Sequence, residues 1–243
     1  MPMSSRLACF LLLLVLLTGC AVPPSTPQPT LQVWRVQRTP ALGWLDDSIN
    51  QCIREQPGSG VLLSGVTAAG LDPLQADISL TWGTVPAEGL PVFQLGTDQL
   101  AVTVHPDNPL RAVTAEQFSN IVSGKWTTWQ QVDGSLSGEI AWWLLPPGDE
   151  THSLLENMLE VDMQMNPFAW LAPDPPAVVQ SVAADTLAIG VVPSRWVDET
   201  VKSIPLQGVD RDTLTLPILA IARQQPDSGL NAFLGCLQKN IGK

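Results

Sequence analysis

The chain has 243 residues, of which 45% are hydrophobic, and 23 acidic against 12 basic residues give it a net charge of −11. This length is sufficient for one or two domains with a sizeable core. The negative charge argues against a nucleic-acid-binding protein, which needs a basic surface. It also means that local dipoles, rather than the overall field, would have to hold any bound anion.

The N-terminus has the pattern of a bacterial lipoprotein export signal. A positive charge precedes the apolar run Leu7–Leu17, and Leu17–Cys20 (LTGC) matches a lipobox. The run is short for a bilayer-spanning helix, although a membrane anchor with an incidental cysteine remains the alternative. We predict a signal peptide over residues 1–19, lipidation of Cys20, and a proline-rich tether over residues 20–30. The protein would then lie outside the cytoplasm, and the lipid alone would attach it to the membrane.

Two cysteines remain for the folded part of the chain, because Cys9 would leave with the signal peptide and Cys20 would carry the lipid. In an oxidising compartment we expect Cys52 and Cys236 to form a disulfide between an N-terminal and the C-terminal helix. The alternative is a pair of buried free cysteines.

The first predicted elements alternate between strands and a helix. Leu31–Val36 favours a strand, and Thr39-Pro40 is a typical helix start, with threonine as N-cap and proline at the first helical position. Apolar residues at helical spacing, including Cys52, give this helix one buried face. Short strands are predicted at Val61–Val66 and Asp77–Leu80.

A capped helix follows the strand predicted over Leu100–Val104. His105–Pro109 forms a turn because proline lacks a donor and Asp and Asn side chains bond the turn backbone. Thr114 and Gln117 form a capping box at the helix start. Ser123-Gly124 ends the helix, since glycine adopts the left-handed conformation at low cost.

This stretch resembles the phosphate-binding-protein branch of the type II periplasmic solute-binding proteins. The family pattern is "lavvvnpdNPv..lt.eqL..IfsGk..nW..vgG", and about forty residues of this chain follow it in order. The matching positions are Val102–Pro109, Thr114–Phe118, Ile121–Lys125, Trp129 and Gly134. The resemblance implies a two-lobed α/β fold with a discontinuous first lobe and a hinge. It also implies an extracytoplasmic protein that captures a small solute for ABC permease subunits.

The later elements continue the alternation of strands and helices, which indicates an α/β architecture. The resemblance implies a first lobe from residues 31–94 plus 193–243 and a second lobe from residues 95–192. The predicted elements are strands at Glu139–Leu145, Leu187–Val192, Ile204–Leu206 and Leu214–Ala222, a helix after Thr151, a helix at Ala177–Ala184, and a final helix capped by Asp227 or Ser228.

No catalytic or metal-binding set is recognisable, so we expect neither an enzyme nor a cofactor. His105 and His152 lie in different segments and are interpreted as solvated surface residues. Asp46-Asp47 is interpreted as a solvent-facing pair. The strand tryptophans, Trp34, Trp142 and Trp143, are interpreted as packing residues rather than as carbohydrate platforms.

The candidate ligand site consists of helix N-termini, whose free N–H groups and dipoles attract anions. The resemblance carries the ligand-binding role to Thr39, Thr81, Gly148 and Thr151, and Arg38 lies beside the first of them. For each position, plain helix capping or a surface charge is the alternative.

The chain departs from the family at this site. Trp82 stands where the family has Asp, Asp149-Glu150 replaces Ser-Gly, and the family's arginine is absent. A carboxylate about 4 Å from a bound anion repels it by roughly 4 kcal/mol at an effective dielectric of 20. The two carboxylates could instead cap their own helix and fill the anion site. We therefore predict that the scaffold is kept and phosphate binding is weakened or lost, with a sensor or interaction module as the alternative function.

Overall fold

A mixed sheet of nine strands runs through the chain in the computed structural model, which describes residues 31–83, 89–134, 136–160 and 166–242. The predicted signal peptide, Cys20 and the tether lie outside these ranges. The order of strands is β2-β1-β3-β11-β4-β8-β6-β7, and β9 pairs with β4. Within the described ranges, no helix is both long and apolar enough to cross a bilayer.

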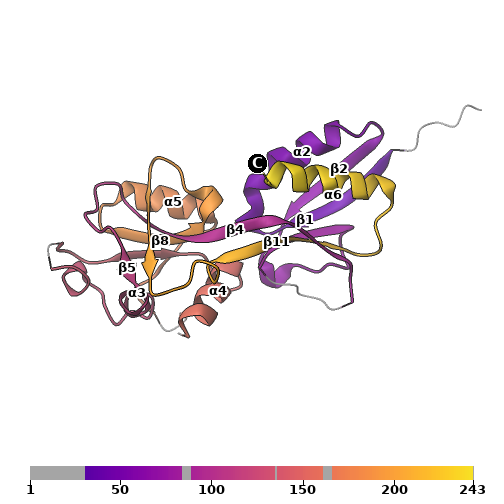
Figure 1. Cartoon of the computed structure of the whole chain (residues 1–243). Helices are drawn as coiled ribbons and strands as arrows, with labels where there is room; N and C mark the ends of the chain where they lie inside the picture. The colour runs from indigo at the N-terminus through magenta and orange to yellow at the C-terminus, as the bar shows by residue number, and fades with distance from the viewer. Residues whose placement is uncertain (1–30, 84–88, 135, 161–165, 243) are drawn as a thin grey trace, which may run out of the picture. The chain divides into compact units, whose positions relative to one another are not determined.

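The first half of the sheet contains the ends of the chain. Parallel strands β1 (Gln32–Arg38), β2 (Ser59–Gly65) and β3 (Ile78–Trp82) are joined by the antiparallel strand β11 (Thr215–Ala222). Helices α2 (Asp46–Arg54) and α6 (Ser228–Ile241) lie side by side on this half (Figure 1). The predicted disulfide between Cys52 and Cys236 is confirmed and joins these two helices.

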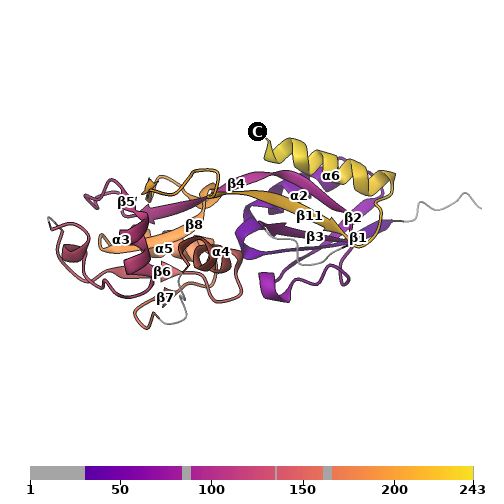
Figure 2. The same cartoon turned by 60° about the horizontal axis from the view of Figure 1, so that its bottom comes forward.

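The long strand β4 (Val92–Val104) connects the two halves of the sheet. It pairs with β11 as far as Gln99 and Thr215, and with β8 from Leu100 and Pro193 onward. We call β1, β2, β3, β11, α2, α6 and the start of β4 the first half, and the sheet beyond Gln99 with its helices the second half. Figures 1 and 2 show β4 passing from one half to the other.

The second half is a sheet with helices on both faces. Helix α5 (Pro175–Ala184) lies on one face, and α3 (Ala115–Val122) and α4 (Glu150–Leu159) lie on the other (Figure 1). Its strands are β8 (Ala188–Pro193), β6 (Ala141–Leu144), β7 (Trp170–Leu171) and β9 (Lys202–Ile204), and β5 (Val113–Thr114) pairs separately with β10 (Leu206–Gln207). The lobe boundaries at residues 95 and 193 remain a prediction. In the structure the partners of β4 change at Gln99, and both β9 and β10 pair within the second half.

Local sequence signals explain several helix ends. The capping box of α3 is confirmed: Gln117 N donates to Thr114 Oγ1 at 3.1 Å and Thr114 N donates to Gln117 Oε1 at 2.8 Å. Gly124 follows this helix with φ of +73°, as predicted. Asp227, rather than Ser228, caps α6, since its Oδ1 accepts from Leu230 N at 2.8 Å.

The predicted helix after Thr39 needs correction, because it is split into two parts. Pro40–Leu45 forms a 3₁₀ helix and α2 begins at Asp46. The interpretation of Asp46 as part of a solvent-facing pair is wrong. Its carboxylate is half-buried and forms an ion pair with Arg38.

Burial confirms the packing role of two tryptophans and corrects one histidine. Trp34 and Trp142 are buried, whereas Trp143 is half-buried and stacks on Trp170 with ring centroids 5.8 Å apart. His152 is only 3% exposed and is not a solvated surface residue. His152 lies in the first turn of α4, and this turn packs against the rest of the protein. The polar residues of the turn are therefore buried although they do not belong to the apolar face of the helix. His105 is half-buried and its Nδ1 accepts from Asp107 N.

Candidate functional site

The C-terminal end of β3 meets the N-terminus of α4, and one carboxylate joins them. Glu150 Oε1 accepts a hydrogen bond from Thr81 Oγ1 at 2.9 Å and another from the backbone N–H of Trp82 at 3.0 Å. All three residues are buried. The donors at the end of β3 therefore bind a carboxylate of the chain itself.

Asp149 has a different role from its neighbour. Its backbone is extended, its Oδ1 accepts from Thr151 N at 2.8 Å, and it is the N-cap of α4. The expectation that these carboxylates cap their own helix is confirmed for Asp149, whereas Glu150 accepts from Thr81 and Trp82 instead. That this contact fills an anion site stays a prediction.

Three buried oxygen atoms around this contact make no hydrogen bond of standard geometry with the described residues. They are Thr39 Oγ1, Glu150 Oε2 and Thr151 Oγ1. The Thr39 hydroxyl lies close enough to Glu150, and that of Thr151 close enough to Asp149, to lower the pKa of each carboxyl. Buried polar atoms without full partners are costly, so this cluster is under-satisfied.

Burial controls the protonation of both carboxyls. Desolvation is the main cause that raises the pKa of Glu150 from 4.5 to about 7, and the nearby charge of Asp149 raises it further. The hydrogen bonds that Glu150 accepts lower its pKa and oppose this rise. Desolvation also raises the pKa of Asp149, although its bonds to Thr151 and the nearby His152 lower it. No basic side chain is among the described groups that perturb the pKa of Glu150.

Gly148 places the loop before α4 against the first half. Its carbonyl accepts a hydrogen bond from Ala69 N at 3.1 Å, and its φ is +91°. A Cβ atom at this position would lie 3.2 Å from the Ala69 side chain. Gly148 therefore allows a close approach of two backbone segments as well as the turn itself.

Arg38 is engaged elsewhere. Its Nε and Nη2 atoms donate to the two carboxylate oxygens of Asp46 at 2.7 and 2.6 Å. Beside this pair is a hollow of about 510 Å³ between the two halves. It is lined by Arg38, Pro40, Gly43, Asp46, Gly65, Val66, Thr67, Pro173, Asp174, Pro176 and Trp196.

The structure thus brings Thr39 and Thr81 to Glu150 and Thr151 to the neighbouring Asp149, and it places Arg38 in an ion pair outside that cluster. Sequence reasoning missed the backbone N–H of Trp82 as a donor. In the sequence, Trp82 differs from the resembled family through its side chain, which replaces Asp. The contact instead uses its backbone N–H, a group that every non-proline residue carries.

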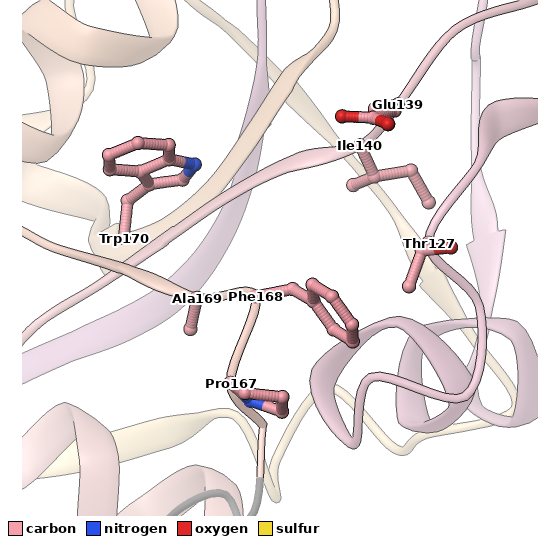
Figure 3. A pocket seen from close by; sticks show the side chains of 7 residues that line it. All are labelled: Thr127, Glu139, Ile140, Pro167, Phe168, Ala169 and Trp170. Carbon is pink, nitrogen blue, oxygen red and sulfur yellow. The ribbon is translucent and has the colours of Figure 1, made fainter.

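A second hollow lies on the second half, away from this cluster. It has a volume of about 370 Å³ and is lined by Thr127, Glu139, Ile140, Pro167, Phe168, Ala169 and Trp170. Figure 3 shows the rings of Phe168 and Trp170 and the side chains of Glu139 and Ile140 around it. It contains none of the predicted ligand-binding residues. In the described part of the chain, no three His, Cys, Asp or Glu side chains are grouped as a metal site.

Comparison with known proteins identifies the architecture. The model of the PBP superfamily domain matches residues 67–228. An ABC-type phosphate transport receptor from Vibrio cholerae is 23% identical, covers 84% of this chain and 93% of its own, and has a TM-score of 0.65. A putative phosphate ABC transporter substrate-binding protein from Clostridium perfringens, solved with bound phosphate, is 16% identical, with coverage of 85% and 93% and a TM-score of 0.74.

The same architecture occurs in a regulatory domain. The reduced OxyR regulatory domain from Pseudomonas aeruginosa is 12% identical, covers 87% of this chain and 100% of its own, and has a TM-score of 0.62. At these identities the structural likeness establishes the fold alone. No curated protein matches the sequence.

Proposed function

Because the chain belongs to the PBP superfamily, we propose that it is an exported, lipid-anchored solute-binding protein that captures a small solute between its two halves for an ABC permease. Its folded part would be tethered through Cys20 and residues 20–30. The solute would be held by the residues at the end of β3, at Thr39 and at the start of α4. The two halves would close on it by a hinge motion along β4.

The contact between Glu150 and the donors of Thr81 and Trp82 carries this proposal. These donors lie where the family resemblance places the oxyanion site. In the present form a carboxylate of the chain occupies it, so a free oxyanion must displace a buried group and meet its negative charge. On this proposal the binding of free phosphate is therefore weakened or lost.

A second function has support from the same contact. A carboxylate that already occupies the site removes the need for a solute, and a regulatory domain shares the fold. On this alternative the protein is a sensor or surface interaction module and takes no small ligand.

A fractionation experiment separates the two functions. Full-length protein purified in detergent is melted in the presence of anionic, neutral and cationic fractions of a small-molecule extract of the source cells. Ligand at a hundred times its dissociation constant adds about 2.7 kcal/mol and visibly raises the melting midpoint. A rise with any fraction supports solute capture, whereas the absence of a rise with all three favours the sensor or interaction module.

A further inference from the structure

The cluster around Glu150 has an excess of acidic and acceptor groups: among the described residues His152 acts as a positive charge on Asp149, but no basic group acts on Glu150 itself. Asp149 and Glu150 are both buried there, and the nearby Arg38 is paired with Asp46. His152, which follows in the first turn of α4, lies beside Glu156 with Nδ1 and Oε2 3.6 Å apart. From the first half, Glu150 is faced by Thr39, Thr81 and Trp82, which are uncharged.

The under-satisfied oxygen atoms of this cluster can act as acceptors, whereas the indole Nε1 of Trp82 is a buried donor without a partner among the described residues. Glu150 Oε2 is a carboxylate oxygen, and Thr39 Oγ1 and Thr151 Oγ1 keep lone pairs free even where their hydroxyl protons point at a carboxylate. A primary ammonium group carries three N–H donors and a positive charge. Such a group could supply this cluster with both hydrogen-bond donors and a balancing positive charge.

We propose that the buried cluster around Glu150 selects a solute with a primary ammonium group, which donates to Glu150 Oε2 and to the free lone pairs of the Thr39 hydroxyl. This inference rests on the proposed function and names its class of solute. The hydrogen bonds of Glu150 Oε1 to Thr81 and Trp82 remain in place and hold the carboxylate in position. The selectivity of this cluster is then opposite in charge to that of an oxyanion site.

The protonation of Glu150 gives this proposal a pH dependence. Burial raises the pKa of Glu150 to about 7, and the ammonium ion binds the ionised form. Because the apparent affinity scales with the competent fraction, binding should weaken by about tenfold from about pH 8 to about pH 6. Asp149, whose pKa is also raised by burial, acts in the same direction.

The test uses methylammonium chloride and the cationic extract fraction with full-length protein in buffers free of primary amines and phosphate. Binding is followed by the melting midpoint and by calorimetry at both pH values. Tetramethylammonium chloride is the ligand control, since it has the same charge but no N–H donor. We expect stabilisation by methylammonium or by the cationic fraction, and none by tetramethylammonium or phosphate.

Two variants connect the result to the site. Glu150→Gln keeps the size of the side chain but removes its charge, and should abolish both the binding and its pH dependence. Glu156→Gln makes the same change on the same helix, at a half-exposed carboxylate beside His152, and should bind like the original protein. Circular dichroism verifies that both variants are folded.

The outcomes separate this inference from the proposed function. Stabilisation by the anionic or neutral fraction alone would overturn the ammonium proposal and leave solute capture standing. Undiminished binding of methylammonium by Glu150→Gln, or equal binding of tetramethylammonium, would also overturn it. If no fraction stabilises the protein, the proposed function fails together with it.

Discussion

The hydroxyl of Thr81 donates a hydrogen bond to Glu150, which lies 69 positions later in the chain. This bond and the one from the Trp82 amide join the end of β3 to the start of α4. The two residues belong to different halves of the protein, so the carboxylate joins those halves at this point.

Replacement of Asp149 and Glu150 by the serine and glycine of the resembled family should create an oxyanion site. In the double variant Asp149→Ser, Glu150→Gly, the serine can still cap α4, and the donors of Thr81 and Trp82 become free. Removal of one carboxylate about 4 Å from the anion relieves roughly 4 kcal/mol of repulsion at an effective dielectric of 20. We expect phosphate to raise the melting midpoint of this variant and to leave that of the original protein unchanged.

Glu156→Gln serves as the control for this exchange, because it alters charge on α4 without reaching the end of β3. A double variant that folds normally but shows no response to phosphate or sulfate would contradict the assignment of this cluster as an occupied anion site.

Stability should depend on pH through Glu150. The pKa of Glu150 in the folded protein, about 7, lies above its ordinary value of 4.5. The contribution of this protonated carboxyl to the free energy of unfolding is therefore complete below pH 4.5 and is lost as the pH rises through 7. The loss corresponds to about 3 kcal/mol at 1.36 kcal/mol for each pKa unit. Urea unfolding over this range should therefore show a decline in the original protein that is missing in Glu150→Gln.

The comparison between the two proteins isolates Glu150, because the other carboxylates titrate in both. Parallel pH profiles for the original protein and Glu150→Gln would show that the carboxyl is not buried as described. Glu156→Gln should keep the original profile.

The disulfide should be a major source of stability. Cys52 and Cys236 are separated by 184 positions, and in the chain-entropy model a loop of this length contributes about 5 kcal/mol. We expect a large fall in the denaturation midpoint in Cys52→Ser, Cys236→Ser. Thiol counting on the unreduced, unfolded protein gives an independent check, because two free thiols in this pair would contradict the bond.

The contact between α5 and β8 depends on the absence of a side chain at Gly190. A Cβ atom there would lie 2.6 Å from Val178 Cγ1 and 3.0 Å from Val182 Cγ2, both on stiff, branched side chains. Gly190→Ala should therefore destabilise the protein by about 1–3 kcal/mol, as overpacking of a core does.

Gly235 provides the matched control for that substitution. It lies in α6, and apart from its chain neighbours and the backbone of its own helix, the described part of the chain has no atom within 4 Å of the position that a Cβ would take there. Gly235→Ala should therefore stabilise the protein by about 0.5–1 kcal/mol through helix propensity. Equal effects of the two changes in urea unfolding would contradict the packing of α5 on β8.

Local signals made much of the fold predictable. The capping box of Thr114 and Gln117 specifies where α3 begins, because both hydrogen bonds form within one turn of helix. The disulfide followed from compartment and cysteine number. The burial of His152 could not be predicted in this way, because it depends on how the first turn of α4 is placed against the rest of the chain.

The composition of the cluster around Glu150 was predictable, but its geometry was predictable only in part. The family resemblance indicated Thr39, Thr81 and Thr151, and the replacement of Ser-Gly by Asp-Glu raised the possibility that carboxylates of the chain lie among them, as Glu150 does. A ligand-binding role for these residues stays a prediction. The pairing of Arg38 with Asp46 was not apparent, since it depends on the 3₁₀ turn that separates β1 from α2.

The bond between α2 and α6 makes a closed covalent ring of everything from Cys52 to Cys236, including the whole second half. A single peptide cleavage inside this ring leaves one molecule whose two pieces stay linked. Removal of the second half needs two separate cuts, and even then the two helices of the first half remain joined. Helices α2 and α6 are thus held together independently of how the second half is arranged or whether it is locally unfolded.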